Sequence, residues 1–278
     1  MRVLVTGAAG HLGGYVIGEL AARGHRLTAL DQHPVEDARV ERAHIGDLQD
    51  RDTVRTALDG VDAVVHLGAI PHPKSDDDSR LFAVNCLTAH RVLDEAGRAG
   101  VPRVVATSSL AAVGLAWAPR PLAPRYLPLD EQHPTLVEDP YGLSKLVLEE
   151  IAHATHRRWG TDIVSLRMPF TGAGTRLKSH FAEVAADPGE HRSGLWGWLD
   201  TRDAATVIRL ALTTALRGSH VINVAAPDTS APQPTAELLE RHFPDVPVLA
   251  PLPGRTSLFD SSACARLLGH SPRRTRTL

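Results

Sequence analysis

Three glycines separate an apolar segment at the start of the chain from a helix-like segment. Residues 3–13 read VLVTGAAGHLG, in which Gly7, Gly10 and Gly13 stand three apart. The apolar run before them has the pattern of a buried strand, and residues 12–23 have the apolar spacing of a helix. A chain that passes from strand to helix through glycines can turn tightly and keep the helix N-terminus clear of side chains.

Apolar runs and helical patterns alternate through the first part of the chain. Five runs are expected as strands, at residues 3–6, 26–31, 63–67, 103–108 and 163–167. Helical patterns lie between them, at residues 12–23, 53–58, 83–99 and 142–159. This alternation predicts an α/β fold, a doubly wound parallel sheet with helices on both faces.

Beyond the fifth run, loops lengthen and Pro and Gly become more frequent. We expect residues 1–167 to form the sheet domain and residues 168–278 a smaller C-terminal lobe packed on it as one compact unit. The lobe is expected to contain helices at 203–216 and 235–242, a strand at 220–224 and a disordered tail at 273–278. The long Pro-rich loop at residues 119–140 is expected to be functional, as long loops of compact domains usually are.

Composition narrows the class of partner. The formal net charge of −2 gives no electrostatic case for nucleic acid or an anionic membrane. No apolar run has the length of a membrane span and the N-terminus lacks a signal pattern, so a cytoplasmic protein is expected. Cys86 and Cys264 have no metal-type spacing. His153 and His156 stand three apart without a third ligand, and no metal site is expected.

The glycine spacing suits a phosphate group. A helix N-terminus offers unpaired N–H groups and a partial positive charge, which a doubly charged pyrophosphate can approach if no side chain intervenes. Gly7 permits the turn, Gly10 permits close backbone approach, and Gly13 lets the helix pack on the strand. The sequence therefore predicts a dinucleotide site at this turn.

Asp31 indicates which dinucleotide is bound. It ends the second expected strand, where an acid hydrogen-bonds the adenosine ribose hydroxyls and repels a 2′-phosphate. The next two residues include no arginine to bind such a phosphate. NAD is therefore favoured over NADP.

A tyrosine and a lysine stand four apart in residues 140–145, PYGLSK. Tyr141 and Lys145 begin an expected helix and so share one face. A phenol has a pKa near 10, and a nearby ammonium group favours its ionised form, as does the positive nicotinamide of an oxidised cofactor. This pairing makes Tyr141 a candidate general acid/base. A hydroxyl partner is expected at the end of the strand before it, in the run Thr107, Ser108 and Ser109.

At this point the sequence resembles a known family. Residues 6–13 fit the T-G-x-x-G-x-x-G signature of the short-chain dehydrogenase/reductase family. The segments LPLDEQHPTLVEDPYGLSK and LRMPFTGAG resemble its extended branch, the NAD-dependent epimerase/dehydratase type. Nearly the whole chain is covered, and its length is nearest to that of uronate dehydrogenases. The resemblance implies a Rossmann domain that binds NAD over residues 1–167, a substrate-binding lobe over 168–278, and a homodimer.

The resemblance also implies site residues. The catalytic set is Tyr141, Lys145 and Ser109, the third residue of the T-S-S run, with Ser108 as the alternative. Expected cofactor contacts are Gly7, Gly10, His11, Leu12, Gly13, Asp31, Asp47, Leu48, Leu67, Gly68, Ala69, Asn85, Tyr141, Lys145 and Pro169. Expected substrate contacts are Ser108, Arg167 and Arg176, with Lys178, His180 and Trp198 as further pocket candidates. Asp203 is expected to cap the helix at 203–216.

These features predict an NAD-dependent oxidoreductase that takes a hydride from a secondary alcohol of a sugar or sugar acid, with Tyr141 as general base. A nucleotide-sugar epimerase or dehydratase that retains its NAD is one alternative. Ser109 is followed by LAA, without the acidic residues a dehydratase needs, which argues against that reaction. A dinucleotide-sensing regulator without catalysis is the other alternative, and the Tyr/Lys pair argues against it.

Overall fold

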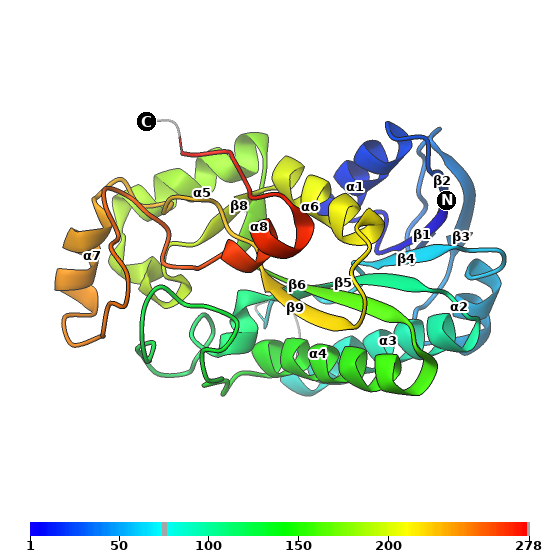
Figure 1. Cartoon of the computed structure of the whole chain (residues 1–278), viewed down its shortest axis with the longest axis horizontal. Helices are drawn as coiled ribbons and strands as arrows, with labels where there is room; N and C mark the ends of the chain where they lie inside the picture. The colour runs from blue at the N-terminus through cyan, green and yellow to red at the C-terminus, as the bar shows by residue number, and fades with distance from the viewer. Residues whose placement is uncertain (74–76, 277–278) are drawn as a thin grey trace.

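A twisted parallel sheet forms the centre of the molecule (Figure 1). The computed structural model describes residues 1–73 and 77–276. Within them, seven strands follow the order β3-β2-β1-β4-β5-β6-β9, and every neighbouring pair is parallel. Their bounds are β1 (Arg2–Thr6), β2 (Arg26–Asp31), β3 (Val40–Ile45), β4 (Ala63–His66), β5 (Arg103–Ser109), β6 (Asp162–Met168) and β9 (Ser219–Asn223). The predicted doubly wound α/β fold is confirmed.

Helices cover both faces of this sheet (Figure 1). One face carries α1 (His11–Ala21), α6 (Thr201–Thr213) and the short α8 (Ser262–Leu268). The other carries α2 (Arg51–Ala57), α3 (Asp78–Arg98) and α4 (Pro140–Trp159). Among the helices of residues 1–73 and 77–276, none combines the length and apolar character that crossing a membrane requires.

Strand alternation explains the two layers. In β1, Val3 and Val5 pack with the α1 and α6 side, while Leu4 packs with the side of α2 and α3. All three side chains are fully buried. Because successive residues of a strand point to opposite faces, a continuous apolar run is what a sheet covered on both sides requires.

A smaller lobe lies at the carboxyl ends of the strands. It contains the two-stranded sheet of β7 (Phe170–Gly172) and β8 (Trp198–Asp200) and the helices α5 (Gly174–Ala186) and α7 (Thr235–His242). Two 3-10 turns, η2 (Leu110–Val113) and η3 (Gly189–Gly194), belong to the same region. The lobe has a core of its own, built mainly from Leu110, Leu115, Leu127, Leu129, Trp196, Leu238 and Phe259.

The expected boundary at residue 167 does not divide these two units. Strand β9 and helix α6 both follow it, yet β9 pairs with β6 in the main sheet and α6 packs on α1. Conversely, residues 110–129 precede the boundary and pack in the lobe. The chain therefore crosses between sheet and lobe several times, a topology that composition along the sequence does not reveal.

The expected disorder of the tail is wrong for residues 273–276. The backbone N–H groups of Arg273 and Arg274 donate to Asp203 Oδ2, at 3.0 and 2.9 Å, and that of Arg276 donates to Asp228 Oδ2 at 3.0 Å. Asp203 therefore binds the tail. The residue that caps α6 is Asp200, whose Oδ1 accepts the N–H of residue 202. Residues 277–278 of the expected tail lie outside the described residues.

Candidate active site

The glycine turn after β1 is packed against the end of β4. Gly7 has φ +67°, and a Cβ placed on it would lie 2.6 Å from the backbone N of Gly68. A Cβ on Gly13 would overlap the carbonyl oxygen of Ala8. Helix α1 begins after Gly10 with no side-chain cap. The turn thus presents uncapped N–H groups at a surface free of side chains, as an anionic group requires.

The Asp31 carboxylate lies beside this turn, at the end of β2. Its Oδ2 accepts the N–H of Ala9 at 3.0 Å, and its Oδ1 accepts the N–H of His33 at 2.9 Å. The glycine loop and the end of β2 are therefore held together by one side chain.

A cavity of about 1050 Å³ extends from the glycine turn, along the carboxyl ends of the strands, into the lobe. The expected site residues that line it are Gly7, Gly10, His11, Leu12, Gly13, Asp31, Asp47, Leu48, Leu67, Gly68, Ala69, Ser108, Ser109, Tyr141, Lys145, Pro169, Arg176 and His180. Four expected residues, Asn85, Arg167, Lys178 and Trp198, do not line it.

Tyr141 lies in the first turn of α4, which the local sequence fixes. Asp139 precedes the helix, and its Oδ1 accepts the N–H of Gly142 at 2.7 Å. Pro140 occupies the first helical position, where its missing N–H does no harm. The ring of Tyr141 is only 8% exposed and lies at the floor of the cavity.

Three polar groups meet at this floor. Ser109 is near enough to Tyr141 to lower the pKa of its phenol, and the Nζ atom of Lys145 lies 5.8 Å from the centroid of the Tyr141 ring. Lys145 Nζ also donates to the carbonyl of Thr107 at 3.0 Å. The Oγ atom of Ser109 accepts the N–H of Ala111 at 3.1 Å, which fixes the side chain at the end of β5.

Burial dominates the electrostatics of this group. It raises the pKa of Tyr141 to about 12, which the nearby Asp139 charge reinforces and the Ser109 hydrogen bond opposes. It lowers the pKa of Lys145 to about 8. The expected lowering of the Tyr141 pKa by Lys145 is thus outweighed by desolvation in the chain itself.

Asn85 supports the cavity wall from behind. Its Oδ1 accepts the N–H of Ile70 at 2.8 Å, and its Nδ2 donates to the Ile70 carbonyl at 3.1 Å and to Ser144 Oγ at 3.1 Å. Asn85 therefore holds the backbone that follows Ala69. The resemblance to the family implies this backbone support for Asn85 as well as a cofactor contact, and the contact itself stays a prediction.

The expectation for Arg167 is also corrected, whereas Ser108 lines the cavity but has its hydroxyl bound by another residue. Arg167 is 5% exposed, and its Nε and Nη2 atoms donate to both carboxylate oxygens of Glu149, at 2.8 and 2.7 Å. The Ser108 hydroxyl donates to Glu149 Oε1 at 2.6 Å. The Arg167 side chain and the Ser108 hydroxyl are thus both bound by Glu149, and Ser109 is the serine that lowers the pKa of Tyr141.

In the lobe, the sequence predictions were incomplete. Lys178 is exposed, and Trp198 is buried with its Nε1 donating to the Asp228 carbonyl at 2.9 Å. His180 does line the cavity, stacked on Phe170 with ring centroids 3.9 Å apart, and burial lowers its pKa to about 4. Lining residues that sequence reasoning missed include Trp117, Leu129, Phe170, Glu183, Glu190, His191, Trp196 and Phe259. They come from loops and from the short elements β7, α5 and η3, which are far apart in the sequence, and only tertiary packing brings them together.

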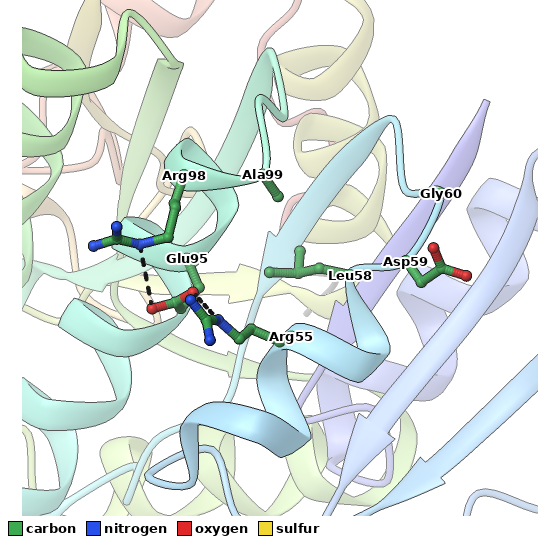
Figure 2. A pocket seen from close by; sticks show the side chains of 7 residues that line it. All are labelled: Arg55, Leu58, Asp59, Gly60, Glu95, Arg98 and Ala99. Atoms are coloured by element: carbon green, nitrogen blue, oxygen red, sulfur yellow. Dashed lines mark hydrogen bonds and ion pairs between the residues drawn. The ribbon is translucent and has the colours of Figure 1, made fainter.

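A smaller cavity of about 390 Å³ lies among the loops that precede β4 and β5 (Figure 2). Its arginines surround Glu95, which is 3% exposed and accepts Arg51 Nε at 2.7 Å and Arg55 Nε at 2.8 Å. Arg98 lies 3.7 Å from the same carboxylate. Open parallel sheets bind ligands at the carboxyl ends of their strands, whereas this cluster lies at the amino ends, so the larger cavity is the candidate site.

The fold and the larger cavity together define a class, the dinucleotide-dependent oxidoreductases built on a doubly wound sheet. Residues 3–225 match the model of the NAD dependent epimerase/dehydratase family. The chain belongs to this family, and the predicted membership of the extended short-chain dehydrogenases/reductases is confirmed. NAD is the cofactor of the family.

The curated relatives that the chain resembles carry the names of different proteins. Sterol demethylase protein B of Methylococcus capsulatus is 43% identical over 120 residues, which are 41% of this chain and 36% of that protein. The chain thus spans only about a third of that relative. Uronate dehydrogenase of Pseudomonas syringae is 27% identical over 223 residues, 80% of this chain and 73% of the relative. The crystal structure of a short-chain dehydrogenase/reductase superfamily protein from Agrobacterium tumefaciens with bound NAD has a TM-score of 0.75 and 25% identity, covering 99% of this chain and 93% of that one.

The residues of the larger cavity fit a dinucleotide. The turn at Gly7 has no room for a Cβ, the N-terminus of α1 has no side-chain cap, and the Asp31 carboxylate lines the cavity where β2 ends. These are a backbone cradle for a pyrophosphate and an acceptor for ribose hydroxyls.

Proposed function

We propose that this protein is an NAD-dependent oxidoreductase that takes a hydride from a secondary alcohol of a sugar or sugar acid, with Tyr141 as general base. One observation carries the proposal. Tyr141, Ser109 and Lys145 meet at the floor of a single cavity that has the glycine turn at one end and the lobe at the other.

The cofactor would be held along the strand ends. The glycine turn and the start of α1 would bind the pyrophosphate, and Asp31 the adenosine ribose. Asp47 and Leu48 would lie at the adenine, while residues 67–69 and Pro169 would flank the nicotinamide half. When bound, NAD supplies the hydride acceptor and a positive charge on its oxidised ring.

The chain supplies the proton chemistry. Ser109 would hydrogen-bond the substrate oxygen and orient it toward Tyr141. Tyr141 would remove the hydroxyl proton at its Oη atom, and Lys145 would hold the cofactor ribose and stabilise the phenolate by its charge. Because burial raises the pKa of Tyr141 to about 12, this positive charge is required for the phenolate to form near neutral pH.

The lobe end of the cavity suits a hydroxylated substrate. The aromatic side chains of Trp117 and Phe170 line this end, and Glu183 and His191 offer hydrogen-bonding groups. Arg176 lines this end, with its Nε donating to the Thr171 carbonyl at 3.2 Å. Its remaining N–H groups would bind the carboxylate of a sugar acid. The homodimer expected from the family stays a prediction.

A nucleotide-sugar epimerase is the second candidate, because the family includes epimerases by name. The two reactions differ in the fate of the hydride, which an epimerase returns to its substrate. An epimerase therefore retains NAD through purification, whereas a dehydrogenase exchanges it with added NAD.

A substrate screen separates these functions. Uronic acids, aldoses and nucleotide sugars are each mixed with the protein and excess NAD, and NADH is followed by its absorbance. Net NADH formation with a free sugar or sugar acid is expected. Inversion of a nucleotide sugar without net NADH, by protein that retains NAD, would establish the epimerase. NAD binding with neither reaction would refute both candidates.

A further inference from the structure

A buried carboxylate lies one helical turn beyond Lys145 on α4. Glu149 is 2% exposed and lies outside the cavity lining. Its oxygens accept three hydrogen bonds, from Ser108 Oγ at 2.6 Å and from Arg167 Nε and Nη2 at 2.8 and 2.7 Å. Ser108 and Arg167 are direct partners in the register of β5 and β6, so both reach the same point on the helix above them.

Removing an ion pair from water carries a large desolvation penalty, and well-packed apolar side chains often stabilise such a position more. Packing alone therefore does not account for the Glu149–Arg167 pair. Neither Glu149 nor Arg167 lines the cavity, and both are buried. Any influence of the pair on the reaction must therefore act through a neighbouring residue.

Lys145 is that neighbour. The titratable groups that face it are Glu149 and Tyr141 on α4, Cys86 on α3 and His66 on β4. Burial keeps the others uncharged near neutral pH, since it raises the pKa of Tyr141 to about 12 and of Cys86 to about 11 and lowers that of His66 to about 3. Glu149, held in an ion pair, is the negative charge in this set, and its field opposes the loss of the Lys145 proton.

The same helix face meets β5 once per turn. Tyr141 lies beside Ser109, Lys145 Nζ donates to the Thr107 carbonyl at 3.0 Å, and Glu149 accepts the Ser108 hydroxyl. Residues four apart on a helix share a face, so the third contact fixes the rotation and height of the first two.

We propose that Glu149 is a positioning residue that keeps the ammonium group of Lys145 charged and aligned beneath Tyr141, with Arg167 and Ser108 holding the carboxylate in place. The inference rests on the functions proposed above for Lys145 and Tyr141. Glu149 itself touches neither substrate nor cofactor.

Removing one charge of the Glu149–Arg167 pair at a time predicts the direction in which the pKa of Lys145 shifts. Glu149→Gln keeps the shape and leaves Arg167 as an unopposed cation, which lowers the pKa of Lys145 by about one pH unit. Arg167→Met leaves Glu149 as an unopposed anion, which raises the pKa of Lys145 by a similar amount. The double variant removes both charges, and because Glu149 is the charge that raises the pKa of Lys145 in the parent, this pKa falls there too, but by less than in Glu149→Gln. Ser108→Ala, which changes no charge, leaves the pKa of Lys145 in place.

The measurement needs no turnover. The chain has three lysines, Lys74, Lys145 and Lys178, so reductive ¹³C-methylation gives a small set of NMR resonances, and the one missing in Lys145→Arg is that of Lys145. Its titration gives the pKa directly. In parallel, the alkaline fall of kcat is expected at lower pH in Glu149→Gln and at higher pH in Arg167→Met.

Opposite shifts in the two single variants, with a downward shift in the double variant that is smaller than in Glu149→Gln, support the inference. No shift in either, or shifts of the same sign, would overturn it. If a single variant does not fold, the double variant still decides, because an unchanged or raised pKa of Lys145 there contradicts the inference. A chain that oxidises no alcohol but shows the opposite shifts would refute the proposed function and leave the electrostatic role of Glu149 standing.

Discussion

Substituting Gly7 by alanine tests the packing of the glycine turn on the end of β4. Gly7 has φ +67°, and an added Cβ would lie 2.6 Å from Gly68 N and 2.8 Å from the carbonyl carbon of Leu67. Both are backbone atoms, so no side chain can rotate away to make room. Gly24, after α1, provides a matched control, since it has φ +75° and no atom within 4 Å of an added Cβ.

Both substitutions place an alanine in a left-handed backbone conformation, but only Gly7→Ala also creates a steric overlap. A left-handed backbone destabilises an alanine by about 1–2 kcal/mol, which applies to Gly24→Ala and Gly7→Ala alike. Overpacking adds about 1–3 kcal/mol at Gly7 alone. We expect Gly24→Ala to reduce the free energy of unfolding by about 1–2 kcal/mol and Gly7→Ala by about 2–5 kcal/mol.

Urea unfolding and an NAD titration read out the two consequences. Gly24→Ala is expected to bind NAD like the parent, because its added methyl group lies far from the cavity. Gly7→Ala shifts the backbone that cradles the pyrophosphate, and its NAD affinity is expected to fall at least about tenfold, or 1.4 kcal/mol. Equal destabilisation by the two substitutions, with NAD affinity retained at Gly7, would refute the packing argument.

Three further outcomes follow from single contacts. Asp31→Ala removes the acceptor of two loop N–H groups and the repulsion of a 2′-phosphate, so the NAD-to-NADP ratio of kcat/KM is expected to fall; an unchanged ratio would contradict that assignment. Burial lowers the pKa of His66 to about 3, so the folded chain excludes a proton that the unfolded chain binds below pH 6.5. The stability this contributes is present above pH 6.5 and is lost as the pH falls toward 3, and His66→Gln is expected to show a shallower loss in urea unfolding across that range. Ending the chain before Arg273 removes its hydrogen bonds to Asp203 and Asp228 and is expected to lower the unfolding free energy by about 1–3 kcal/mol; an unchanged melting temperature would show the tail to be unimportant.

Local signals account for what the sequence could predict. The continuous apolar run of β1, the glycines after it and the helical spacing of α1 are adjacent in the chain and need no tertiary information. The same holds for Tyr141 and Lys145, because helix periodicity alone puts them on one face. The strand β3, with the sequence VERAHI, went unpredicted since it alternates partly buried and exposed residues at the sheet edge.

Long-range contacts explain the features that the sequence could not predict. The arginine-rich terminus has the composition of a disordered segment. In the structure it is held in place, because Asp203 and Asp228, some 70 and 48 residues away, accept its backbone N–H groups. The sequence suggests that Arg167 binds the substrate, but in the structure its guanidinium group is paired with Glu149. In each case the deciding partner is distant in the sequence, and no periodicity marks it.

The most direct test of the central claim is Tyr141→Phe, with turnover and NAD affinity measured on the same preparation. The substitution removes one oxygen from a buried ring and leaves the glycine turn and Asp31 untouched. We expect NADH formation from the best substrate to fall by about 10²–10⁴-fold while the Kd for NAD stays within about threefold. Turnover close to that of the parent would contradict Tyr141 as the base, however well the rest of the site is placed.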